Sequence, residues 1–119
     1  MELRTTAAFE SGEDDLIFVT FYDEVRGYGF SISRQAGSEE LEVMVSDQSN
    51  YYLSDFDVCL ERNGFTADFP AGTIDCGDGE DHYQVRFQID EGDYANLVTA
   101  FQRLFTGKKG LTIRSDNAS

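Results

Sequence analysis

Apolar and polar residues alternate through most of this chain, and that alternation constrains the fold more than any other feature. Tyr28, Phe30 and Ile32 alternate with glycine and serine, and the same period of two recurs over 41–47 and 82–89. Successive side chains point to opposite faces of a strand, so each segment is predicted to be a strand with one dry face. Turn-forming residues separate the segments, and we expect a mainly antiparallel sheet of about six to eight strands.

The first half of the sequence predicts two further strands and a hairpin. Residues 3–9 form the weakest predicted strand, whereas 15–22 is an unbroken apolar and β-branched stretch. Such a stretch is typical of a strand covered on both faces, so we expect 15–22 to lie centrally in the sheet. The segment 28–47 is predicted to form a hairpin around a polar turn.

The dipeptide Asn63-Gly64 is the clearest hairpin signal, because a two-residue type I′ turn needs positive φ at both central positions. The predicted cross-strand pairs are Arg62 with Phe65, Leu60 with Ala67, and Val58 with Phe69. This register collects the apolar residues of both strands on one face. The opposite, largely acidic face consists of Asp57, Cys59, Glu61, Thr66 and Asp68.

One segment near the end has helical periodicity instead. Asp90 is the predicted N-cap, and a charged side chain at Asp93 favours the positive end of the helix dipole. Gly107 is a natural residue to end the helix, and 111–114 is predicted to be a short final strand. The apolar stripe of the helix consists of Tyr94, Leu97, Val98, Phe101, Leu104 and Phe105.

These elements predict a single α+β domain over residues 1–114, with one C-terminal helix packed on one face of the sheet and a polar tail at 115–119. A chain of 119 residues fits one ordinary domain, and its 40% hydrophobic content is enough for a folded core.

Charge narrows the choice of partner. Twenty-three acidic residues against nine lysines and arginines give a formal net charge of −14. Such a chain repels phosphate, so we expect neither direct nucleic-acid binding nor association with anionic membranes, and we expect basic partners to be attracted. The two cysteines are expected to be free thiols, and the absence of a leader or a long apolar run predicts a cytoplasmic protein. A homodimer is permitted.

Catalytic and metal-binding interpretations are weak. His82 lies on the polar face of its predicted strand with no local catalytic signature, so an exposed strand histidine is favoured over a general base. The acidic loop 75–82 departs from the calcium-loop pattern at Gly77, which favours a solvated loop over a cation site. We therefore predict no enzyme, no catalytic residue, no cofactor and no metal site.

The segment 47–52 allows two interpretations. Its residues Asp47, Gln48, Ser49, Asn50, Tyr51 and Tyr52 follow a predicted strand end. They suit either a turn that bonds its own backbone or a recognition corner in which tyrosines supply rigid contact area.

Several of these segments together resemble a known family. Leu41 to Gln48, the strand 58–63, the strand 85–87 and the helix Tyr94 to Phe105 closing on Gly107 are similar to immunity proteins of bacterial polymorphic toxin systems, nearest to the family catalogued as immunity protein ten. The similarity covers roughly the last two-thirds of the chain, although Tyr51-Tyr52-Leu53-Ser54 stands where that family has a more glycine-rich turn. The resemblance implies a non-catalytic cytoplasmic inhibitor that binds a cognate protein toxin.

Charge and alternation, rather than the resemblance, select the candidate partner-binding residues. They are Asp57, Glu61 and Asp68, with Asp47, Gln48, Tyr51 and Asp78 as lesser candidates. An acidic surface suits a toxin with a basic cleft, for example a nuclease. Two alternatives stay open at this point: an acidic adaptor or nucleic-acid mimic unrelated to toxins, and a small enzyme using His82 or the 75–82 loop.

Overall fold

The computed structural model describes residues 2–5, 8–13, 16–45, 49–70, 72–73 and 81–114. These residues form an α+β fold with ten strands in two five-stranded sheets and one C-terminal helix. The α+β class and the mainly antiparallel pairing are confirmed, whereas the expected six to eight strands were too few. The sequence interpretation treated residues 3–9 as one strand, but they belong to two strands in different sheets, and Ser49–Leu53 is a strand where a turn was considered.

The first sheet, here the meander sheet, pairs consecutive strands antiparallel in the order β2-β3-β4-β5-β6. Short connections allow this order, because an antiparallel neighbour can be reached through a tight turn. Its strands are β2 (Ala8–Glu13), β3 (Leu16–Asp23), β4 (Tyr28–Gln35), β5 (Leu41–Val45) and β6 (Ser49–Leu53).

The second sheet, here the mixed sheet, has the order β1-β9-β8-β7-β10. Its three central strands are antiparallel, and the outer strands β1 and β10 run parallel to their neighbours. The strands are β1 (Glu2–Thr5), β7 (Asp57–Glu61), β8 (Gly64–Asp68), β9 (His82–Phe87) and β10 (Leu111–Ile113).

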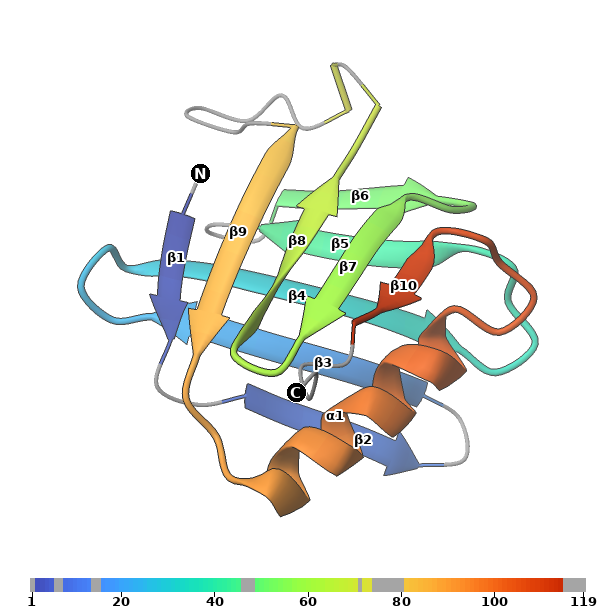
Figure 1. Cartoon of the computed structure of the whole chain (residues 1–119). Coiled ribbons are helices and arrows are strands. Elements are labelled where there is room, and N and C mark those ends of the chain that lie inside the picture. The colour runs from blue at the N-terminus through green and yellow to red at the C-terminus, as the bar shows by residue number, and fades with distance from the viewer. Residues whose placement is uncertain are drawn as a thin grey trace.

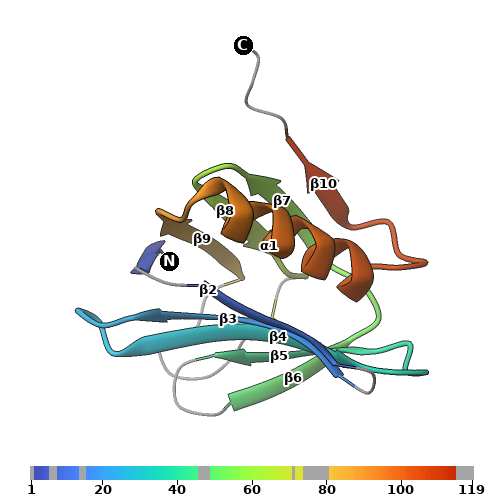
Figure 2. The same cartoon turned by 90° about the horizontal axis from the view of Figure 1, so that it is seen from below.

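The two sheets face each other across one core, with their strands crossing at a steep angle (Figure 1). The helix α1 (Glu91–Leu104) lies beside the mixed sheet, in the same layer, and covers part of the inner face of the meander sheet (Figure 2). Its contacts are chiefly with β2 and β3. The expected docking of the helix on one face of a sheet is therefore confirmed.

Aromatic rings fill the space between the layers. Phe65 lies 5.0 Å from Phe21 and 5.4 Å from Phe101 between ring centroids, so one side chain of the mixed sheet touches both the meander sheet and the helix. Phe30 of the meander sheet lies 5.1 Å from Tyr83 of the mixed sheet, again between ring centroids. Tilted and edge-to-face pairs of this kind add to the free energy gained by burying the rings.

The strand β3 differs from its predicted environment. Val19 and Phe21 are buried, but Leu16 is 37% exposed and Tyr22 55% exposed. The expectation of burial on both faces was wrong. Within the described part of the chain, the mixed sheet and the helix cover one side of the meander sheet and nothing covers the other (Figure 2). The apolar run therefore predicted the strand correctly, but the prediction that a second layer covers its other face was wrong.

The helix ends as the sequence predicts, with one addition. Asp90 is the N-cap and accepts from the Asp93 amide at 2.8 Å. Gly107 adopts φ +80° in the turn after the helix. The guanidinium of Arg34, on β4, donates to the carbonyls of Leu104 and Thr106 at 2.9 and 2.8 Å, which satisfies acceptors left open at the helix end.

The hairpin β7–β8 has the predicted faces but not the predicted register. Leu60 pairs with Phe65, not with Ala67, so the turn residues are Arg62 and Asn63 and not Asn63-Gly64. Because the shift is two residues and strand side chains repeat every two, every residue stays on its predicted face.

Two contacts explain this register. A Cβ on Gly64 would lie 2.3 Å from the Val85 carbonyl oxygen, so glycine is needed in the strand where β8 approaches β9. The Arg62 guanidinium donates to the Ile89 carbonyl at 2.8 Å and lies 5.0 Å from the centroid of the Tyr94 ring, which holds Arg62 in the turn.

Candidate functional site

A row of polar side chains crosses the outer face of the mixed sheet at the end where β8 finishes. Asp57, Asp68 and His82 are direct neighbours on β7, β8 and β9, and all three are exposed. His82 Nδ1 lies 2.5 Å from Asp68 Oδ1, so the imidazole and that carboxylate share a hydrogen bond. We call this set the acidic row.

The acidic row carries an electrostatic cost. Asp57 and Asp68 are direct cross-strand partners. Like charges opposite each other destabilise a sheet by about 0.2–1 kcal/mol. His82 offsets this repulsion only when it is protonated. The two neighbouring carboxylates therefore make the row a place where a positive charge from outside would be favourable.

A hollow of about 400 Å³ lies beside the acidic row. It is lined by Phe56, Phe69 and Pro70 together with Asp57 and Asp68. The Phe56 and Phe69 rings lie 4.7 Å apart and are almost fully buried in the core, so Pro70 is the exposed apolar residue of this lining. Lys109 and Gly110 close the side next to β10.

Asp55 holds that side of the hollow in place. Its carboxylate accepts from the backbone amides of Lys109 at 2.9 Å and Gly110 at 3.1 Å. The Gly110 carbonyl in turn accepts from the Val58 amide at 2.9 Å. A Cβ on Gly110 would lie 1.8 Å from the Phe56 carbonyl oxygen, so only glycine permits this close approach of the two segments.

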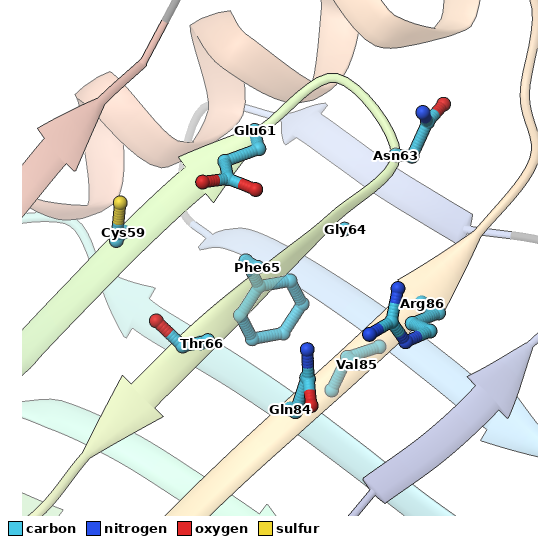
Figure 3. Close-up of a pocket in the computed structure, with 9 residues that line it drawn as sticks. All are labelled: Cys59, Glu61, Asn63, Gly64, Phe65, Thr66, Gln84, Val85 and Arg86. Carbon is cyan, nitrogen blue, oxygen red and sulfur yellow. The ribbon is translucent and has the colours of Figure 1, made fainter.

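The other end of the same face is charge-balanced. Figure 3 shows Glu61 and Arg86 on either side of a smaller hollow, about 170 Å³, that opens where Gly64 has no side chain. Glu61 accepts from Arg114 at 3.0 Å, and this hydrogen bond raises the pKa of Arg114. Arg86 donates to Glu2 at 2.7 Å.

The outer face as a whole is thus less acidic than the hairpin alone suggests. The sequence interpretation considered only β7 and β8, whereas the neighbouring strands add Arg86 and Arg114 to the same surface. Asp57 and Asp68 are brought together, and Glu61 lies further along the hairpin in its own ion pair. Negative charge is therefore concentrated at the acidic row.

Of the lesser candidates, Tyr51 is the one that the structure describes, and it does not join this site. Tyr51 lies on β6 of the meander sheet and packs, partly buried, against the core. The second half of the predicted corner is therefore an edge strand. Asp47, Gln48 and Asp78 lie outside the described residues, as do Cys76 and most of the loop 75–82. Cys59 is a free thiol, as expected.

The apolar part of the site was missed at the sequence level. Phe56 directly precedes β7 and Phe69 directly follows β8, so the two rings flank the hairpin at matching positions. The sequence did carry a signal for this part of the site. Two aromatic residues, Phe56 and Phe69, stand just outside the hairpin, and two acidic residues, Asp57 and Asp68, stand just inside it. Within the described ranges, no three histidine, cysteine, aspartate or glutamate side chains gather in a way that could hold a metal ion.

Comparison with protein families, curated proteins and solved structures finds no match for this chain. In the described part of the chain, no helix is long and apolar enough to cross a membrane.

Proposed function

We propose that this protein is a cytoplasmic immunity protein that binds a cognate bacterial toxin and neutralises it by covering a basic surface. The observation that carries the proposal is the hollow beside the acidic row, whose lining combines the exposed residues Asp57, Asp68 and Pro70. The resemblance to immunity proteins supplies the class of partner.

The hollow suits one kind of anchor, an arginine or lysine side chain of the partner. The aliphatic stem of such a residue gains by contact with apolar walls, while its charged head pairs with carboxylates. Arginine fits best, because its planar guanidinium can donate to two oxygens at once. Arginine is also among the residues that most often dominate binding energy at protein interfaces.

The charge of the whole chain supports the same partner. A net charge of −14 attracts a cationic protein from a distance and raises its association rate. This long-range attraction is screened by salt over about 8 Å at physiological ionic strength. Binding to a basic toxin is therefore expected to weaken as salt is added.

A second candidate function uses the same surface. An acidic adaptor or nucleic-acid mimic would present carboxylates to a basic DNA-binding protein of the host, and the acidic row favours it equally. The two functions differ in the partner, so they are separated by asking which basic protein is bound.

The test is the single substitution Asp57→Asn. It removes the repulsion with Asp68, so the free energy of unfolding should rise by about 0.2–1 kcal/mol. The same substitution removes one carboxylate from the hollow, so affinity for the toxin candidate encoded beside this gene should fall about tenfold or more. Urea unfolding measures the change in stability, and titration calorimetry together with growth rescue in co-expression measures the change in affinity.

Glu24→Gln is the matched control, because Glu24 is an exposed acid in a turn of the meander sheet and its loss changes the net charge equally. Equal affinity of the two variants would refute the proposed site. Binding to DNA-binding proteins, with no rescue from the toxin, would favour the adaptor. His82→Ala should leave rescue intact, whereas loss of rescue by a folded variant that still binds the toxin would support the enzyme alternative.

A further inference from the structure

The outer face of the meander sheet carries exposed large hydrophobic side chains among small and uncharged polar ones. Alternation along β3 to β6 turns one set of residues into the core and the other set away from it. Four of the exposed large hydrophobic side chains lie on this outward set: Leu16 at 37%, Tyr22 at 55%, Met44 at 36% and Tyr52 at 60% exposure. We call the outward set of β3 to β6 the open face.

The open face is also almost free of charge. Its outward positions, taken from the strand register, are Leu16, Phe18, Thr20, Tyr22, Gly29, Ser31, Ser33, Gln35, Glu42, Met44, Asn50 and Tyr52. Glu42 is the single charged residue among these described positions, and its carboxylate accepts from Asn50 Nδ2 at 2.9 Å. In a chain whose charged residues make up 27%, one face has been left neutral.

We propose that the open face binds a second copy of this chain, meander sheet against meander sheet. A two-fold interface brings the same patch of both copies together, so every charge near the axis faces its own like charge. A chain with a net charge of −14 can therefore meet its own copy favourably only through a surface that lacks carboxylates. Among the described surfaces of the two sheets, the open face meets that condition.

The relief of the open face is self-complementary. Tyr22 on β3 and Tyr52 on β6 stand at the two sides. Next to β3, the strand β4 carries the small outward residues Gly29, Ser31 and Ser33 before Gln35, and we call this row of small residues the channel. A large ring beside such a row allows the tyrosine of one copy to pack over the channel of the other. Tyrosine and serine together are typical of surfaces that bind proteins.

The area is sufficient for a weak dimer. Its four strands hold 8, 8, 5 and 5 residues at about 3.3 Å each and are spaced by about 4.8 Å, which gives a face of roughly 400 Å². Two such faces bury about 800 Å² in total, which is below the standard size of a specific interface and in the range of weak, transient ones. The acidic row lies on the mixed sheet, in the other layer, and stays free in such a dimer (Figure 2).

The test is the association constant of the whole chain, measured by sedimentation velocity from low to high micromolar concentration. Wild-type protein should dimerise, and association should strengthen with added salt because screening weakens the repulsion between two acidic bodies. This dependence is opposite in sign to the one expected for the toxin complex. A wild-type chain that stays monomeric throughout would overturn the proposal.

Two variants of equal charge locate the interface. Ser31→Glu places a carboxylate in the channel of the open face, and Thr112→Glu places one on the exposed outer face of the mixed sheet. Ser31→Glu should raise the dissociation constant about tenfold or more, because the substitution enters a two-fold interface twice. Thr112→Glu should leave it nearly unchanged.

Equal dissociation constants for the two variants would refute the open face as the interface. Thermal unfolding followed by circular dichroism establishes that both variants are folded. Ser31→Glu should still rescue growth from the toxin, since the acidic row is untouched, so loss of dimerisation and loss of the proposed function are distinguishable.

Discussion

Asp23 is a buried carboxylate on which the meeting of three strands depends. Its side chain is 4% exposed, and it accepts from the backbone amides of Arg4 at 2.8 Å, Val25 at 3.0 Å and Arg26 at 3.0 Å. The bond from the Arg4 amide ties β1 to the end of β3. These hydrogen bonds, the one from Arg4 first, together with the nearby Arg26 charge, lower the pKa of Asp23 below its ordinary value of 3.8.

Asp23→Asn is expected to destabilise the fold by about 2–4 kcal/mol at pH 7, because three charge-assisted bonds become neutral ones and an amide NH₂ faces N–H donors. Urea unfolding at pH 7 measures this value. A carboxyl whose pKa is lower in the folded state contributes stability above its unfolded pKa and loses it as pH falls through the folded pKa. The difference between wild type and Asp23→Asn should therefore shrink once the pH drops below about 3.8.

Glu24→Gln is the control for Asp23, because Glu24 is the next residue and is exposed, so its stability should change by less than about 0.5 kcal/mol. If Asp23→Asn unfolds at the same urea concentration as wild type at pH 7, the three hydrogen bonds do not stabilise the fold. If the difference between the two persists unchanged at acid pH, the ionised carboxylate is not its source.

Two further substitutions test the fold at single positions. Gly64→Ala should destabilise by about 2–3 kcal/mol, because the new methyl group meets the Val85 carbonyl, whereas Gly92→Ala in the first turn of α1 should be neutral or stabilising by up to about 1 kcal/mol. Thermal unfolding ranks the pair, and equal effects would refute the close approach. Arg34→Ala should lower the free energy of unfolding in urea by about 2–3 kcal/mol, because the Arg34 guanidinium caps α1. Arg103→Ala, at an exposed position of the same helix end, should lower it far less. Similar losses of stability in the two variants would contradict the cap.

The period-two pattern predicted which side of β4, β5, β9 and the hairpin β7–β8 is buried, and in the hairpin it did so although the register was wrong. Alternation carries no information about which strands become neighbours, however, and the charge balance of the outer face depends on that order. Arg86 and Arg114 come beside the hairpin only through β9 and β10, which pair with it across long sequence distances. The common face of Asp57 and Asp68 was predicted from alternation, but their direct pairing was not, because the predicted register placed Asp68 opposite Cys59.

The edge strand β6 shows a second limit. Its residues, Ser49 to Leu53, combine turn-forming and aromatic types, and sequence alone favoured a turn or a corner. Pairing with β5 overrides that local preference, since an added strand satisfies the backbone of its neighbour and buries Tyr51 against the core. Tertiary context of this kind is not encoded in a five-residue window.

The parallel pairing of β1 with β9 has a consequence for biosynthesis. Thr5 donates to the Arg86 carbonyl across a sequence separation of 81 residues, whereas every pairing in the meander sheet joins consecutive strands. Contacts between distant parts of a chain form slowly, and a nascent polypeptide leaves the ribosome from its first residue onwards. The meander sheet therefore emerges with Phe21 and Phe30 still uncovered, and it must wait for β9 and the helix before those rings are hidden from water and from chaperones.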